Sequence, residues 1–212
     1  MTLKTRRQDT KAALMRAAER LFAEKGLGGV SVRDITLAAG ARNQSALHYH
    51  FGGMSELISE VFAHRYRAIE DARRKRLAEM AAAGTDGDIL KLMEAAVSPL
   101  LEACHEEDGR LYARFCVQLT TDPRFDVLQL IRDTGMESAN LMRELIGEAL
   151  ADLPEDILRT RLTRLFTISM ILMADYAGLV EAGNPPPLDE ATCEAASTLT
   201  GFLLAPAPSQ AG

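Results

Sequence analysis

The chain has 212 residues, of which 47% are hydrophobic, and a formal net charge of −6. This length suits one ordinary domain or a small domain fused to a larger one, and the hydrophobic share excludes a disordered chain. Aromatic residues make up only 5%, and tryptophan is absent. Because alanine and leucine dominate and alternating β-branched runs are scarce, the sequence predicts an all-α fold.

Charge is divided unevenly along the chain. Residues 1–83 hold 15 Lys and Arg against 9 Asp and Glu, whereas residues 84–212 hold 9 against 21. These balances of +6 and −12 indicate a basic N-terminal part that faces nucleic acid and an acidic remainder with another role. The alternative is an uneven solvated surface that takes no part in binding.

The first residues form a polar segment that carries Lys4, Arg6 and Arg7. Residues 1–9 are predicted to be either a disordered terminus or an arm that touches DNA phosphate or enters a minor groove. A helix is predicted over residues 10–25, because apolar residues recur there at helical spacing and a glycine follows.

Two short helices joined by a turn come next. Ser31 is a good N-cap and Asp34 completes a capping-box-like pattern, which predicts a helix over residues 31–39. Gly40 supplies the turn. Asn43 is the expected N-cap of a third helix to about residue 49, which is too short to be stable without packing on the first two.

A long helix is predicted to begin at Met54 or Ser55 and to end near residue 83. Its basic cluster lies about five turns from the start of the helix, and comprises Arg73, Arg74, Lys75 and Arg76. We expect this cluster to be solvated surface rather than a DNA contact, since it lies far along the helix.

The remainder reads as successive helices, with a kink expected at Pro99. The predicted ranges are 88–106, 109–120, 123–150, 154–182 and 189–204. The expected organisation is a DNA-binding domain with its arm over residues 1–53, a larger helical domain over 54–204, and a disordered tail over 205–212.

Cysteine usage and hydropathy bear on the compartment. The three cysteines lack metal-ligand spacing, and an odd number without a recognisable signal peptide fits a reducing, cytoplasmic environment. The apolar segment 165–180 is short for a membrane span and is interrupted by Asp175. We expect it to be buried in protein, and we expect neither a membrane partner nor a cofactor.

The stretch from about Thr10 to Leu57 resembles the N-terminal DNA-binding domain of tetracycline-repressor-like (TetR family) transcriptional regulators. The resemblance rests on the order Phe-Ala-Glu-Lys-Gly, Val-Ser-Val-Arg-Asp-Ile, Ala-Ala-Gly and Tyr-His-Phe, and it covers about a quarter of the chain closely. It implies a homodimer of all-helical subunits that binds a palindromic operator, usually represses, and is released by a small ligand in the C-terminal domain.

Two departures from the family pattern concern the same region. The turn from Gly40 to Asn43 is one residue longer than the commonest family pattern, which brings Arg42 near the phosphate backbone or a base edge. Where many members carry a phosphate-gripping lysine at the start of the fourth helix, this chain has Met54. The backbone N–H groups there could still bind phosphate.

The predicted DNA contacts divide by chemistry. A helix N-terminus suits phosphate, and the resemblance implies phosphate contacts for Tyr49 and His50. Small or hydrogen-bonding side chains, here Gln44, Ser45 and His48, suit base edges. The predicted set is Ser31, Val32, Arg42, Asn43, Gln44, Ser45, His48, Tyr49 and His50. A metal pair at the two histidines is the alternative, but these residues face different directions and lack a third ligand.

The helix over 154–182 has almost no polar face, so it must be buried on all sides. A partner subunit is the natural cover, which predicts a four-helix, two-fold interface; the alternative is a purely intramolecular core. The predicted interface residues are Leu165, Ile168, Leu172, Leu179, Cys193, Ala196, Leu199, Phe202 and Leu203.

Methionines and aromatics recur in the same half and could line a ligand cavity between helices, although they also suit a plain core. The predicted lining is Met93, Val97, Tyr112, Phe115, Cys116, Leu119, Phe125, Met136, Met170, Met173 and Tyr176. Basic residues are sparse at plausible lining positions, which favours an apolar or neutral effector.

The sequence therefore favours a ligand-responsive DNA-binding repressor. A dimeric DNA-binding protein without an effector is a second interpretation. An all-helical enzyme is a third, but no Ser/His/Asp, Cys/His or carboxylate–histidine grouping has a recognisable spacing, so we expect no enzyme activity.

Overall fold

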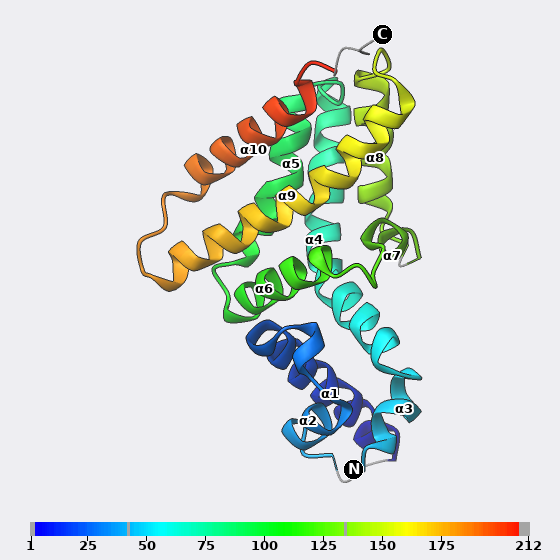
Figure 1. Ribbon diagram of the computed structural model, residues 1–212. Helices are drawn as coiled ribbons and strands as arrows, with labels where there is room; N and C mark the ends of the chain where they lie inside the picture. Colours follow the sequence, from blue (N-terminus) through cyan, green and yellow to red (C-terminus); the bar gives the residue numbers. More distant parts are fainter. Residues whose placement is uncertain (1–2, 42, 134, 208–212) are drawn as a thin grey trace.

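The computed structural model describes residues 3–41, 43–133 and 135–207. Within these ranges the chain is helical and has no β-strand (Figure 1), so the all-α prediction is confirmed. The helices are α1 (Leu3–Lys25), α2 (Val32–Ala38), α3 (Ser45–Phe51), α4 (Met54–Ala83), α5 (Ile89–Ala103), α6 (Glu107–Thr121), α7 (Val127–Asp133), α8 (Glu137–Ala149), α9 (Glu155–Glu181) and α10 (Leu188–Leu204), with a 3₁₀ turn η1 (Leu27–Gly29) after α1.

The first helix is longer than the sequence analysis predicts. It begins at Leu3 rather than near residue 10, because no proline or glycine interrupts the chain between Leu3 and Lys25. The basic segment, which was predicted to be either a disordered terminus or a DNA-contacting arm, thus forms the first turns of α1. Of its three basic residues, Arg7 is the one whose side chain the structure describes.

The predicted helix over 123–150 is two helices. Helix α7 ends at Asp133, Gly135 adopts a left-handed backbone with φ +67°, and α8 begins at Glu137. A left-handed residue cannot continue an α-helix, and glycine takes that conformation without steric cost. Helix α5 ends at Ala103 rather than near residue 106, and Pro99 lies within it.

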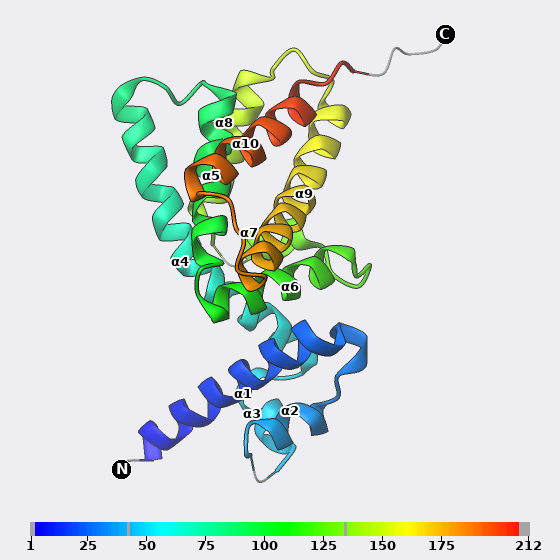
Figure 2. The same cartoon turned by 90° about the vertical axis from the view of Figure 1, so that its left-hand side faces the viewer.

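Helix α4 connects the two parts of the molecule. Helices α1, α2 and α3 gather around its N-terminal end (Figures 1 and 2). Farther along, α4 packs against α5, α6 and α8. The buried side chains form one continuous cluster through both parts. Where the parts meet, the rings of Phe22 on α1 and Phe115 on α6 stack with centroids 5.9 Å apart. The division at residues 53 and 54 stays a prediction.

Helix α9 is long and apolar enough, by length and composition alone, to cross a membrane. The core helix of a soluble protein passes the same test. Here α9 packs against α6 and α10, but only 33% of its most apolar window is buried inside this chain. One face of α9 is therefore open.

Candidate nucleic-acid interface

Helix α2 begins with the predicted capping box. The Asp34 N–H donates to Ser31 Oγ (3.2 Å), and the Ser31 N–H donates to Asp34 Oδ2 (2.9 Å). The Ser31 hydroxyl also donates to the same carboxylate, and these hydrogen bonds lower the pKa of Asp34. Because both the hydroxyl and the N–H of Ser31 are occupied, phosphate would have to bind the backbone N–H groups of Val32 and Arg33.

Gly40 makes the turn between α2 and α3. Its φ is +66°, its N–H donates to the Leu37 carbonyl (3.1 Å), and the next N–H, of Ala41, donates to the Thr36 carbonyl (2.9 Å). This pair of bonds is a Schellman motif, which closes a helix end and requires a left-handed residue. Arg42, a predicted DNA contact, lies outside the described residues.

Helix α3 starts at Ser45, one residue later than the sequence predicts. Its N-cap is Gln44, whose side chain makes no capping bond, while Asn43 Oδ1 accepts a hydrogen bond from the Ser45 N–H (3.0 Å). Asn43 therefore supplies the capping side chain from the position just before the N-cap. Leu47 and Phe51 are buried, and their packing compensates for the short length of α3.

The predicted base-reading side chains share the exposed face of α3. Gln44, Ser45 and His48 are exposed. His48 Nδ1 lies 3.0 Å from the Gly52 carbonyl, and because a carbonyl only accepts, Nδ1 must donate the proton. In the neutral ring, Nε2 is then an acceptor. Such a group can receive a hydrogen bond from a base amino group in a major groove.

A basic edge from α1 borders this face. The guanidinium of Arg7 lies 4.7 Å from the ring centroid of Tyr49, which is 64% exposed. Lys11 Nζ lies 5.3 Å from the ring centroid of Phe51. Partial burial lowers the pKa of His50, and the charges of Arg7 and Lys11 lower it further, which favours the neutral ring. Lys11 is absent from the predicted DNA contacts, although its spacing of four residues from Arg7 indicates a shared helix face.

The start of α4 differs from the sequence expectation of a backbone phosphate site. Gly53 is the N-cap and no side chain caps the helix. The Glu56 carboxylate folds back over this end, since a Cβ added to Gly53 would lie 2.8 Å from Glu56 Oε2. An acidic group already faces the α4 N-terminus and would repel a phosphate there.

An ion cluster ties these helices to the larger part. Arg65 on α4 donates to both carboxylate oxygens of Glu19 on α1, with Nε–Oε1 at 2.8 Å and Nη2–Oε2 at 2.9 Å. Its Nη2 also lies 2.8 Å from Oδ2 of Asp108 on α6. Burial raises the pKa of Glu19 despite the attraction of Arg65. Arg65 therefore clamps α1, α4 and α6 together.

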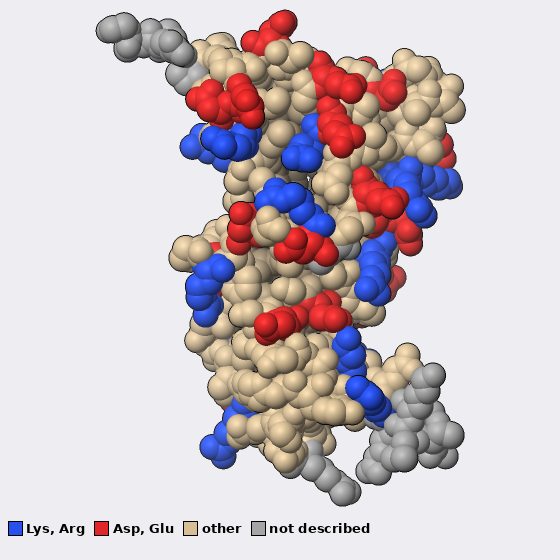
Figure 3. Space-filling view, turned by 90° about the vertical axis from the view of Figure 1, so that its right-hand side faces the viewer, with Lys and Arg blue, Asp and Glu red and all other residues tan. Residues whose placement is uncertain are grey.

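Charge is distributed along the long axis as the sequence predicts. On the face in Figure 3, most acidic side chains lie on the C-terminal part, and the lowest part bears Lys and Arg around an uncharged surface. The basic cluster of α4 is not one solvated patch, however. Arg74 and Lys75 are exposed and Arg76 is half-buried, whereas Arg73 is buried.

The predicted effector-pocket residues are packed in the core. Ten of the eleven are buried, and Phe125 is half-buried. None of them lines the open groove of about 840 Å³ between α4, α5 and α10. Its walls include Arg76, Met80, Ala95, Ser98, Leu188 and Cys193. Close packing of methionines against aromatics is one account of this burial, and the effector pocket stays a prediction.

The predicted dimer residues divide into two groups. Ala196, Leu199 and Leu203 have 0% exposure, because they face α5, and Leu165 is also buried. They cannot present side chains to a second subunit. The exposed or half-exposed members are Ile168, Leu172, Leu179, Cys193 and Phe202. Within the described residues, no group of three or more His, Cys, Asp or Glu could hold a metal ion.

Two family models match this chain. The model described as "Bacterial regulatory proteins, tetR family" matches residues 14–61, which hold α2, α3 and most of α1. The model described as "Tetracyclin repressor-like, C-terminal domain" matches residues 94–205. A sequence search of curated proteins found no match.

Solved structures share the fold over most of the chain. A putative tetR family transcription regulator from Shewanella sp. PV-4 is 18% identical, with 90% of this chain and 95% of that chain covered and a TM-score of 0.65. NalD of Pseudomonas aeruginosa, the secondary repressor of the MexAB-OprM multidrug efflux pump, is 21% identical (91% and 96% covered, TM-score 0.56). PfmR of Thermus thermophilus, a TetR family regulator, is 20% identical (98% and 98%, TM-score 0.52).

Identities this low show the fold alone, but the C-terminal family model by itself spans more than half of the chain, and the N-terminal model covers the helix-turn-helix unit. The chain belongs to the tetR family of bacterial regulatory proteins.

Proposed function

We propose that this protein is a cytoplasmic transcriptional repressor that binds a palindromic operator as a homodimer and releases it when a small-molecule effector binds the C-terminal part. The observation that carries the proposal is the exposed face of α3, where Gln44, Ser45 and His48 stand beside Tyr49 and the α1 cation Arg7. This juxtaposition supplies base-edge donors and acceptors next to groups for phosphate.

The repressor role is supported by family membership and by NalD, which is described as a repressor. A short helix held by its neighbours, with hydrogen-bonding side chains outward, fits a recognition helix that lies in a major groove. We infer that Tyr49 and Arg7 contact phosphate, whereas Gln44, Ser45 and His48 contact bases. Val32 and Asn43 offer backbone or amide donors at the edges of the same surface.

A homodimer is supported by the open faces of α9 and α10. Ile171 on α9 is 48% exposed, Leu179 is 39% exposed, and Leu204 on α10 is 56% exposed. Helices α9 and α10 lie side by side (Figures 1 and 2), so two copies can pair them in a four-helix arrangement about a two-fold axis. Gly201 is exposed on α10, and its small size allows close approach.

The dimer is tested by two matched variants. Ile171→Glu places a charge in the proposed interface and should convert the protein to a monomer in sedimentation velocity. Leu141→Glu is the control, because Leu141 on α8 is similarly exposed (43%) but lies outside the interface. A wild-type monomer at micromolar concentration, or equal effects of the two variants, would contradict the dimer.

The division of DNA contacts is tested by mobility shift with the protein's own upstream DNA. Tyr49→Phe and Arg7→Gln should weaken binding to every sequence, because each removes a contact to phosphate. Gln44→Ala should relax the preference at one base position by about 1–3 kcal/mol. Arg164→Gln, which removes an exposed charge on α9, is the control. Loss of affinity without loss of preference in Gln44→Ala would contradict its role.

A further inference from the structure

Arg73 is the unusual member of the basic cluster on α4. Its side chain points into the protein, and the residue is only 4% exposed. Nη1 donates to the Tyr66 hydroxyl, and Nη2 donates to the Ala96 carbonyl on α5 (3.0 Å). Nε has no partner among the described residues. A guanidinium is always charged and carries five N–H donors, so these two bonds leave most of its capacity unused.

No carboxylate pairs with this buried cation in the described part of the chain. The adjacent basic residues are each paired with an acid: Arg74 with Asp71, Lys75 with Glu79, and Arg76 with Glu102. Those pairs are largely solvated, where an ion pair contributes little. The buried cation, for which an anion matters most, is the member of the cluster without one.

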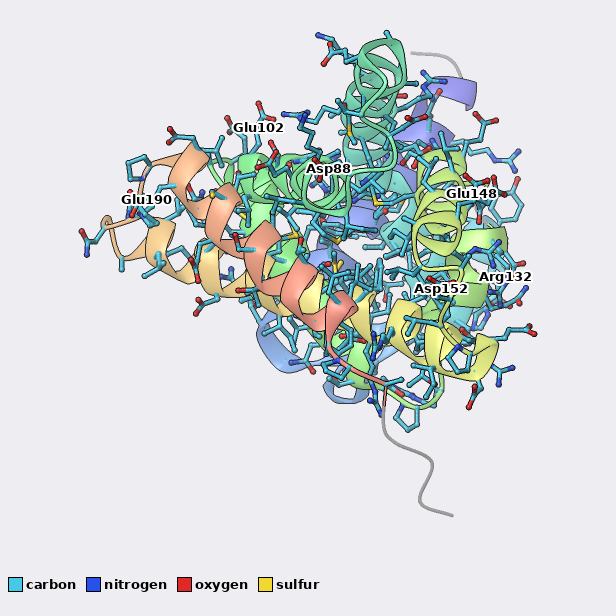
Figure 4. The ribbon with its side chains drawn as sticks, turned by 90° about the horizontal axis from the view of Figure 1, so that it is seen from above. Asp88, Glu102, Arg132, Glu148, Asp152 and Glu190 are labelled. Atoms are coloured by element: carbon cyan, nitrogen blue, oxygen red, sulfur yellow. The ribbon has the colours of Figure 1, made fainter. Side chains whose placement is uncertain are left out.

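The acids nearest in sequence are committed elsewhere. Glu70, one turn before Arg73, accepts from the N–H and the hydroxyl of Ser138 on α8 (2.6 and 2.7 Å). In the view from above, Glu102, Glu148 and Glu190 lie around the outside of the helices (Figure 4). These three carboxylates therefore lie at the periphery of this view.

A second buried arginine, Arg161, has partners that offset the cost of burying its charge. Arg161 on α9 donates to the carbonyl groups of Leu203 (2.5 Å) and Pro206 (3.2 Å). Leu203 lies in the last turn of α10, where unpaired carbonyls and the helix dipole favour a cation. Arg73 instead bonds a carbonyl in the middle of α5, where no helix end supplies negative potential.

We propose that Arg73 and Tyr66 form the anchoring subsite for an anionic effector, a monocarboxylate with an apolar body. A carboxylate accepts bidentate bonds from a guanidinium, and its charge neutralises the buried cation. The Tyr66 hydroxyl accepts from Arg73 and can donate its own proton to the same anion. Tyr66, Ile69 and Leu77 flank Arg73 on the buried face of α4, which suits an apolar body. This ligand class replaces the neutral effector that the sequence favours.

The proposal rests on the proposed effector response and has a test that involves no DNA. Thermal unfolding is measured at constant ionic strength with benzoate and octanoate, and with benzamide and octanamide as neutral partners of the same shape. At least one carboxylate should raise the wild-type Tm by about 2 °C or more, and its amide should not. Arg73→Met should abolish the rise, and Arg161→Met should keep it. No rise with either carboxylate, or a rise that survives in Arg73→Met, would overturn the proposal.

The unliganded variants give an independent readout. The guanidinium carbon of Arg73 lies 5.3 Å from the ring centroid of Tyr66, but no carboxylate pairs with it among the described residues. Arg73→Met should therefore leave the Tm unchanged or raise it, whereas Arg161→Met should lower it by several degrees. An Arg73→Met protein destabilised as much as Arg161→Met would assign Arg73 a structural role and overturn the subsite. A normal carboxylate response in a protein that fails to bind DNA would instead count against the proposed function alone.

Discussion

Replacing Arg65 should lower the free energy of unfolding by an amount that can be worked out from its contacts. Arg65→Met leaves the Glu19 carboxylate, whose side chain is 5% exposed, without its bidentate partner. Removing one partner of a buried ion pair typically costs about 3–5 kcal/mol. Glu19 has an alternative, however, because it can take up a proton and become neutral.

The electrostatic cost of Arg65→Met cannot exceed the free energy needed to protonate Glu19. A carboxyl of ordinary pKa 4.5 costs about 3.4 kcal/mol to protonate at pH 7 and about 1.4 kcal/mol at pH 5.5, since each pH unit corresponds to about 1.36 kcal/mol. A folded-state pKa raised above the unfolded value stabilises the fold at low pH, and this stability is lost as pH rises through the folded pKa. The loss of unfolding free energy caused by Arg65→Met should therefore be smaller at pH 5.5 than at pH 7, by up to about 2 kcal/mol.

Urea unfolding at the two pH values measures this difference. Wild type, Arg65→Met and the double variant Glu19→Gln/Arg65→Met are compared, with Arg67→Met as the control at an exposed position of α4. The free energy of unfolding of Arg67→Met should stay within about 0.5 kcal/mol of wild type. The double variant should not show the added pH dependence of Arg65→Met, because it lacks the Glu19 carboxyl. A cost of Arg65→Met that is equal at both pH values would refute the reasoning.

Two further predictions concern the backbone and the thiols. Gly40→Ala should lower the free energy of unfolding in urea by about 1–2 kcal/mol, because an alanine is strained at φ +66° even though no atom blocks its Cβ. An unchanged free energy of unfolding would contradict the Schellman motif. Of the three cysteines, Cys193, which is exposed in the single subunit, should react first with a thiol reagent at pH 7.5. Cys104 and Cys116 should react only on unfolding, because they are buried and burial raises the pKa of both thiols, that of Cys104 to about 12; three fast thiols in the native protein would argue against this packing.

Local signals predict the helix-turn-helix unit well. The Ser31–Asp34 capping box and the Gly40 turn depend on residues a few positions apart, so the sequence alone specifies them. The outward placement of Gln44, Ser45 and His48 follows from helical periodicity. The start of α1 was predicted too late because a polar helical turn carries no apolar periodicity to reveal it.

Features that depend on tertiary packing were harder to predict. Consecutive basic residues at Arg73–Arg76 read as one charged surface, yet successive helical positions are about 100° apart, so one of the four turns into the core. An apolar helix such as α10 gives no signal of which side faces its own chain, which explains why Leu199 was assigned to the dimer. Met93 and its neighbours could not be divided between core and cavity, because both use the same side chains.

The most direct test of the DNA-binding claim is equilibrium binding of the wild-type protein to its upstream DNA and to a scrambled duplex over a salt series. The logarithm of the binding constant should fall linearly with the logarithm of salt concentration on both duplexes. The upstream DNA should bind at least about 10³-fold more tightly than the scrambled one. Binding that is independent of salt, or equal on the two duplexes, would contradict a regulator that reads an operator through α3.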